Sequence, residues 1–104
     1  MSAKSVFKLS LLEVERLVRR QSALDVNVRL TIHALARMRV RRITREEVFT
    51  VLCQGKLSKL PEPNVAFGSL ECRMQRFMAG REVAVVAAIS DVDPTVVVVT
   101  AIVL

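Results

Sequence analysis

One histidine and two arginines are spaced so that they can act together on an anion. His33, Arg37 and Arg41 stand at positions i, i+4 and i+8 of a run with helical periodicity. At about 100° per residue, these positions fall within about 80° of one another on one side of a helix. An imidazole exchanges protons near neutral pH, and guanidinium groups bind a phosphate and stabilise charge that develops on it. This is the smallest set of groups that can cleave RNA by attack of its 2′-hydroxyl.

The set lacks a second proton carrier, because the chain has no other His and no Tyr. Glu71, or an arginine that acts only electrostatically, would complete the chemistry. A competing interpretation makes His33, which follows the apolar Ile32, a partly buried packing residue with a backbone hydrogen bond. The residues alone leave both interpretations open.

The charge of the chain favours a polyanionic partner. Sixteen Lys and Arg stand against ten Asp and Glu, and residues 16–45 hold nine arginines against a single acid, Asp25. A planar guanidinium binds phosphate through two parallel hydrogen bonds and stacks on bases, so RNA fits this segment better than other partners. An acidic protein is the alternative partner. The RNA-binding candidates in this segment are Arg29, Arg39, Arg42 and Arg45.

Capping signals predict the first two helices of the N-terminal half. Ser10 followed by Glu13 forms a capping box, which predicts a helix over about 10–22. Thr31 can cap a second helix that runs to about Arg41. We expect the apolar side of this second helix to consist of Ile32, Leu35, Ala36 and Val40.

A third helix and a change of periodicity follow. Thr44 and Glu47 form another capping box, and Gly55 stands where a left-handed C-terminal cap is expected. Pro61 and Pro63 then break the helical pattern, and the period beyond them is two. The chain therefore divides into helices first and strands second.

The C-terminal half predicts a sheet. Residues 70–77 and 83–89 alternate around a turn at Gly80, which indicates a hairpin. Residues 95–104 are rich in β-branched side chains and predict a central strand buried on both faces, while 25–30 suit a short strand or an extended lead-in. The predicted fold is α+β: N-terminal helices packed on a C-terminal antiparallel β-sheet, in a single domain over residues 1–104.

Other residue types narrow the function. Cys53 and Cys72 have no metal-ligand spacing, so we expect reduced thiols in the core, no metal and no cofactor. Trp and Tyr are absent, and Phe49 and Phe77 fall inside predicted elements as core candidates, which disfavours base stacking on aromatic platforms. The N-terminal residues lack the apolar block of a signal peptide, and no run is long enough for a membrane span. These features predict a cytoplasmic protein.

The predicted second and third helices resemble a known type of domain. The run HAxxRMxxR from His33 to Arg41, followed by Ile43 and a V…L..G helix ending at Gly55, resembles an uncharacterised bacterial and phage domain family. That family is similar to the RelE and BrnT toxins, within the group of barnase, EndoU, colicin and RelE-like ribonucleases. The resemblance covers about 28–104, leaves the helix at 10–22 outside, and implies a RelE-like fold.

The resemblance also implies a site and a function. It marks His33 and Arg37 as the functional pair and Arg41 as a supporting cation, and by analogy it adds residues from the sheet. The implied activity is that of a small, metal-independent endoribonuclease toxin, or of a toxin-like RNA-binding protein. Its partners would be RNA or the ribosome, with an antitoxin or immunity protein as a further partner. The sheet residues implied are Arg73 in the catalytic set, and Arg76 and Thr100 in RNA binding.

Two other functions are consistent with the same residues. A non-catalytic phage or bacterial protein could use the arginine-rich side or the apolar sheet edge to bind and inhibit a host protein. A DNA-binding regulator could use the second and third helices as a helix-turn-helix, although only Arg45, Thr50 and Gln54 would reach bases. The sequence leaves the oligomeric state open between a monomer and a homodimer.

Overall fold

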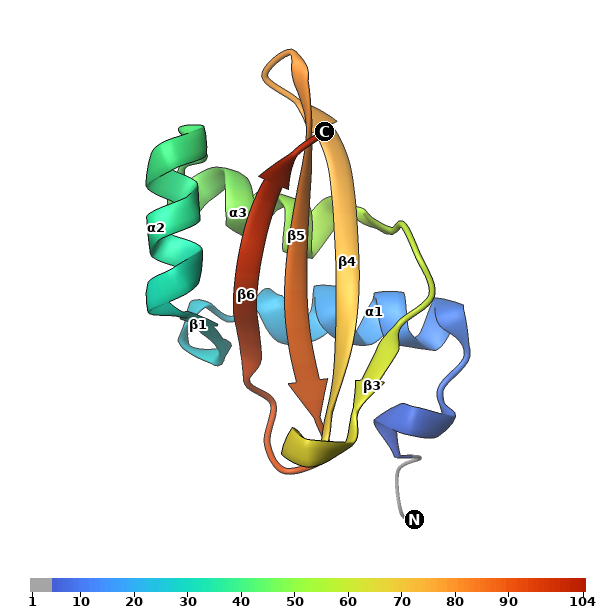
Figure 1. The fold of residues 1–104 in the computed structure, drawn as a ribbon. Coiled ribbons are helices and arrows are strands. Elements are labelled where there is room, and N and C mark those ends of the chain that lie inside the picture. Colours follow the sequence, from blue (N-terminus) through green and yellow to red (C-terminus); the bar gives the residue numbers. More distant parts are fainter. Residues whose placement is uncertain (1–4) are drawn as a thin grey trace.

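Two helices cover one face of a long, twisted sheet (Figure 1). The computed structural model describes residues 5–104, and within them the sheet has six strands in the order β1-β6-β5-β4-β2, with β3 also paired to β4. The helices are α1 (Leu11–Ser22), α2 (Ile32–Arg41) and α3 (Arg45–Gln54). The strands are β1 (Val28–Leu30), β2 (Lys56–Leu57), β3 (Glu62–Asn64), β4 (Ser69–Met78), β5 (Arg81–Ser90) and β6 (Val96–Val103), and short 3-10 turns are η1 (Val6–Lys8), η2 (Asp25–Asn27) and η3 (Val65–Phe67).

The predicted α+β class is confirmed, with helices N-terminal and strands C-terminal. Both predicted capping boxes form: the Ser10 hydroxyl accepts from the Glu13 N–H at 3.2 Å, and the Thr44 hydroxyl accepts from the Glu47 N–H at 3.0 Å. Thr31 caps α2 in the same way, through the N–H of Ala34 at 3.0 Å. Local side-chain hydrogen bonds thus set where each helix begins.

The sheet is antiparallel except at one edge. The predicted hairpin forms between β4 and β5, and β6 pairs antiparallel with β5, whereas β1 runs parallel to β6 through only three residues. The prediction that 95–104 form an interior strand is confirmed, because β6 lies between β1 and β5, but the prediction that it is buried on both faces is wrong, because only one face of β6 is buried. Within residues 5–104 only one helical layer covers the sheet, so the other face of β6 is half-exposed.

The core lies between the sheet and the layer formed by α1 and α3. Val14 and Val18 of α1 and Val51 of α3 are fully buried against the sheet. Met38 and Met74 are buried in the core, and Met78 packs partly against it. Cys72 is also buried, and its desolvation raises the pKa of its thiol to about 12, so this thiol stays protonated and unreactive.

The opposite face of the sheet carries no helix in the described chain, and we call it the open face (Figure 1). It mixes polar and small apolar side chains that alternate with the core residues along each strand. By strand alternation and register, its side chains are Arg29 of β1; Ser69, Glu71, Arg73, Gln75 and Phe77 of β4; Glu82, Ala84, Val86, Ala88 and Ser90 of β5; and Val97, Val99, Thr100 and Ile102 of β6.

The predicted left-handed cap at Gly55 is wrong. Gly55 is extended, with φ −75° and ψ 177°. A Cβ at this position would lie 2.4 Å from the carbonyl oxygen of Val51 and 2.9 Å from that of Gln75, so the close approach of α3 to β4 requires glycine. The left-handed residue at a helix end is instead Arg42, which ends α2 with φ 54°.

The predicted apolar side of α2 is also wrong. Ala34 and Met38 are the buried side chains of this helix, whereas Ile32 is 88% exposed and Val40 is 74% exposed; Leu35 and Ala36 are exposed too. The reason is the position of α2 beside the sheet edge rather than on its face (Figure 1). A helix placed there buries only a narrow stripe of side chains.

Arg81 ties the β4–β5 hairpin to the junction of α2 and α3. Its guanidinium donates to the carbonyl oxygens of Arg41, at 2.9 Å, and of Arg42, and it forms an ion pair with Glu47 at 3.2 Å. The N–H of Thr44 also donates to the Glu47 carboxylate at 2.8 Å. These contacts lower the pKa of the Glu47 carboxyl from its ordinary 4.5, first through the Thr44 hydrogen bond and then through Arg81.

None of the described helices is long and apolar enough to cross a membrane.

Replacement of Glu47 by Gln is expected to flatten the acid side of the stability profile. Because the folded state lowers the pKa of this carboxyl, its contribution is present above pH 4.5 and is lost as the pH falls through the lower folded-state value. Urea unfolding at pH 7 and pH 3 measures this. The wild type should lose more unfolding free energy between these pH values than Glu47→Gln does, and equal losses would contradict the lowered pKa of the Glu47 carboxyl.

Candidate functional site

Two side chains fasten α2 along the outer edge of β6. At the start of α2, the Thr31 hydroxyl donates to the carbonyl oxygen of Val98 at 2.9 Å, and its N–H donates to the same oxygen at 3.2 Å. At the end of α2, Arg41 Nη1 donates to the carbonyl oxygen of Ala101 at 2.6 Å. These groups satisfy carbonyls of β6 beyond the short pairing with β1. Arg41 is therefore half-buried and serves first to hold the helix.

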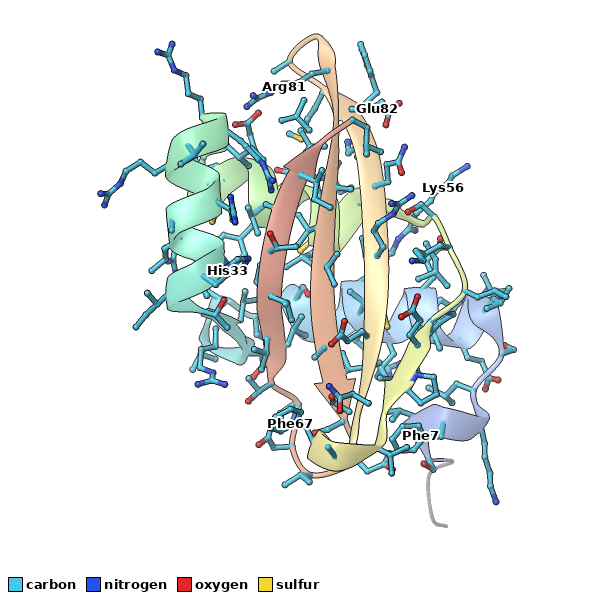
Figure 2. The ribbon with its side chains drawn as sticks, viewed as in Figure 1. Phe7, His33, Lys56, Phe67, Arg81 and Glu82 are labelled. Atoms are coloured by element: carbon cyan, nitrogen blue, oxygen red, sulfur yellow. The ribbon has the colours of Figure 1, made fainter. Side chains whose placement is uncertain are left out.

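This fastening turns His33 and Arg37 toward the open face. The two residues precede the buried Ala34 and Met38 by one position each, so they lie on the same flank of the buried stripe, about 40° apart. Figure 2 shows His33 in the first half of α2, on the side next to β6. Both side chains are exposed, and within residues 5–104 neither is held by a hydrogen bond or an ion pair. The interpretation of His33 as a partly buried packing residue is wrong.

The sheet register brings Arg73 and Thr100 into one row. Thr100 of β6 pairs with Val86 of β5, and Val86 pairs with Arg73 of β4. With strands about 4.8 Å apart, the Cα atoms of Arg73 and Thr100 are about 10 Å apart across the open face. Arg73 Nε donates to the Ser58 hydroxyl at 2.9 Å, and no hydrogen bond within residues 5–104 engages its terminal nitrogens.

Glu71, the predicted second proton carrier, lies on the same face as Arg73. The two residues are two positions apart on β4, so they project on the same side about 7 Å from each other. Both line a small hollow of about 190 Å³ that also reaches Val86 and Ile102. A strip of small apolar side chains on the open face is flanked by two pairs of residues. His33 and Arg37 of α2 lie on one side, which we call the His33 rim, and Glu71 and Arg73 of β4 lie on the other.

Other predicted cations are not brought to this strip. Arg39 and Arg42 are exposed on the flank of α2 opposite His33, and Arg45 begins α3 with its guanidinium 4.9 Å from the centre of the Phe49 ring. Arg76 belongs by alternation to the helix side of β4, where it donates to the carbonyl oxygen of Gln54 at 3.3 Å.

Arg29 lies on the open face, near the start of α2. It pairs in register with Val97, close to the turn that holds Asp93. The hydroxyl and the N–H of Thr95 lower the pKa of the Asp93 carboxyl, and the charge of Arg29 lowers it further. Arg29 is therefore partly neutralised by a carboxylate of its own chain.

The aromatic expectations need correction. Phe49 packs partly against the core, but Phe77 is 63% exposed at the far end of the open face, because the hairpin extends beyond the helices behind it. Phe67, for which the sequence suggested no role, is 81% exposed on η3 and borders a hollow of about 650 Å³. We call it the Phe67 hollow; it is lined by Arg29, Thr31, Phe67, Ala88, Val97 and Val99 among others. An aromatic residue between a Pro-rich segment and Gly68 is the signal that could have identified it.

A family model describes most of this arrangement. A domain of unknown function, DUF4258, matches residues 30–103. The chain belongs to the DUF4258 family. The match contains α2, α3 and the strands from β2 to β6, so the DUF4258 region includes the His33 rim and the open face and leaves α1 outside. No curated protein and no solved structure matches the chain. The expected relation to a domain family without known function is confirmed, while the likeness to RelE and BrnT toxins stays a prediction.

Removal of the Arg41 side chain is expected to destabilise this DUF4258 domain. In Arg41→Ala the Ala101 carbonyl loses its charged donor, which should cost about 1 to 3 kcal/mol of unfolding free energy. Urea denaturation measures the change. Arg39→Ala, on the exposed side of the same helix, is the matched control and should change stability by less than about 0.5 kcal/mol. Equal effects of the two substitutions would contradict the fastening role of Arg41.

Proposed function

We propose that this DUF4258 protein is a small, metal-independent endoribonuclease of the toxin type, resembling RelE and BrnT. The observation that carries the proposal is the exposed pair His33 and Arg37, aligned in successive turns at the rim of an uncovered sheet face. A proton-exchanging group beside a phosphate-binding group is what RNA cleavage requires. The excess of arginine in residues 16–45 attracts RNA to this side of the molecule.

The proposed reaction uses the 2′-hydroxyl of the substrate as the nucleophile. The neutral imidazole of His33 accepts the proton of the 2′-hydroxyl, and the 2′-oxygen bonds to phosphorus. The bond from phosphorus to the 5′-oxygen breaks, and this oxygen takes a proton from water or from the carboxylic-acid form of Glu71, while the imidazole of His33 keeps the proton of the 2′-hydroxyl and later releases it to solvent. The products are a 2′,3′-cyclic phosphate and a 5′-hydroxyl, so no metal or cofactor enters the balance.

In this proposal two arginines stabilise the negative charge of different phosphates. Arg37 lies beside His33 and binds the scissile phosphate, where its charge stabilises the negative charge that grows on the equatorial oxygens. Arg73 projects from the sheet across the same strip and neutralises a neighbouring phosphate, with Thr100 as a hydrogen-bonding group on the way. Arg41 acts as a positioning residue, since its guanidinium holds α2 at this distance from β6.

Loss of the rim pair is expected to abolish cleavage without unfolding the protein. His33→Ala removes the proton acceptor and Arg37→Ala removes the phosphate ligand, so each should lower the rate of RNA cleavage by about 100-fold or more. Purified variants are tested on a fluorescent oligoribonucleotide, with thermal melting as the folding check. Because both side chains are exposed, the melting temperature should hardly change.

The matched control is Arg16→Ala, which removes one exposed arginine from α1, behind the sheet. Arg16→Ala removes the same single positive charge as Arg37→Ala. It should retain the wild-type cleavage rate within about twofold, measured with translating ribosomes present and absent. Cleavage at the wild-type rate in both His33→Ala and Arg37→Ala would eliminate the proposed mechanism.

A second candidate function, the binding and inhibition of another protein, is favoured by the outward side of α2. Ile32, Ala36 and Val40 recur every fourth residue and form an exposed apolar stripe, which we call the outer stripe. The helix that carries it contains three arginines and no acid. An acidic amphipathic helix, such as that of an antitoxin or a host protein, would complement both the stripe and the charge.

A charge reversal in the outer stripe separates the two functions. Ile32→Glu should weaken binding of a stoichiometric acidic partner by about 10-fold or more and leave RNA cleavage unchanged, because Ile32 points away from the open face. Isothermal titration with the product of the neighbouring reading frame measures the first effect. If that protein binds with equal affinity to wild type and Ile32→Glu, the outer stripe is not its docking surface.

A further inference from the structure

The Phe67 hollow occupies the part of the open face that adjoins the start of α2. Its volume of about 650 Å³ falls within the range of sites that hold small organic molecules. Thr31, which caps α2 two residues before His33, lines one edge of this hollow. The hollow and the His33 rim therefore share the β1–α2 junction, and one ligand can reach both.

The lining of the hollow is suited to a flat ring with polar edges. Ala88, Val97 and Val99 form an apolar floor from two adjacent strands. Phe67 stands at one side with its ring largely exposed to solvent (Figure 2). Aromatic rings and apolar floors bind the faces of bases, and side-chain amides and hydroxyls bind their edges.

Polar groups of that kind surround the floor. The amide of Asn64 and the hydroxyls of Ser69 and Ser90 all line the hollow, and they come from β3, β4 and β5. Asn64 pairs in register with Ser69, and Ser69 pairs with Ser90, so the three residues form one row at the end of the sheet. An amide and two hydroxyls can each donate and accept hydrogen bonds, as the edge of a nucleobase requires.

We infer that the Phe67 hollow binds one nucleobase of the RNA, stacked on Phe67, with the attached ribose and phosphate directed toward Arg29 and His33. The inference rests on the proposed function and assigns to it a base-binding subsite. The charges agree with this assignment, because Glu71 and Asp93 line the hollow against a single cation, Arg29. Such a lining repels a bare phosphate but accepts a neutral base.

Nucleotide titrations followed by methyl NMR test the inference. Each of the four nucleoside 3′-monophosphates is added to the full chain, and ribose 5-phosphate serves as the probe without a base. At least one nucleotide should shift the methyl signals of Ala88, Val97 and Val99, whereas ribose 5-phosphate should leave them in place. Phe67→Ala should weaken the nucleotide affinity by about fivefold or more, because it removes the stacking contact.

Phe77→Ala is the matched control, since Phe77 is also exposed on the open face but lies at its other end. It should leave the nucleotide affinity unchanged, and both variants should melt as the wild type does. The inference is overturned if no nucleotide shifts these methyl signals, if ribose 5-phosphate shifts them equally, or if Phe67→Ala keeps full affinity.

The outcome is distinguishable from that of the proposed function, because binding is measured without cleavage. Cleavage that depends on His33 together with a silent Phe67 hollow would overturn the base subsite alone. Nucleotide binding in the hollow together with full cleavage by His33→Ala would support the subsite and contradict the His33 mechanism.

Discussion

The position of α2 and of the candidate site depends on how the backbone hydrogen-bonding groups along the free edge of β6 find partners. β1 pairs with β6 through only three residues, so the backbone of β6 beyond Val98 needs other partners. Thr31 and Arg41 supply donors at the two ends of α2, and Ala34 lets the helix approach closely because it has no bulk beyond Cβ. A helix replaces a strand at this edge. The same contacts decide which side of α2 faces the open face.

The uncovered side of the sheet is the second constraint. Its residues alternate with core residues, so the same strands must present apolar side chains to α1 and α3 and a mixed surface to solvent. Val86, Val97 and Val99 on this surface are only half-buried. Apolar groups exposed together on a folded protein mark surfaces that bind something. Two hollows lie on the same face, which supports the proposal that the open face binds a ligand.

Sequence patterns predicted the elements well where the signal was local. The capping residues Ser10, Thr31 and Thr44 located three helix starts, and period-two alternation located the hairpin, because these signals act through hydrogen bonds and side-chain directions within a few residues. The burial of α2 could not be predicted in this way. Its most apolar stripe faces solvent, since the orientation of the helix is set by contacts with residues about 60 positions away.

The candidate site was predictable in part for the same reason. The pairing of His33 with Arg37 follows from helical spacing alone, whereas the row from Arg73 to Thr100 depends on a strand register that the bulge between β5 and β6 shifts. Arg76 differs from Arg73 by an odd number of positions, so it falls on the opposite face of β4. Phe67 was missed because exposure of a loop aromatic depends on the turn that carries it.

The number of arginines in the sequence does not tell which of them are free to bind a ligand. Nine arginines in residues 16–45 indicate a strongly cationic side, but the structure commits some of them to the fold. Arg19 donates from Nε and Nη2 to the carbonyl oxygen of Gly55, at 2.9 and 2.6 Å, and Arg41 holds Ala101. A guanidinium bound to a backbone carbonyl keeps its charge and contributes to the long-range field, yet it has fewer donors left for a phosphate. The exposed Arg37 retains its donors at short range, and for this reason it, rather than the total charge, supports the proposed phosphate site.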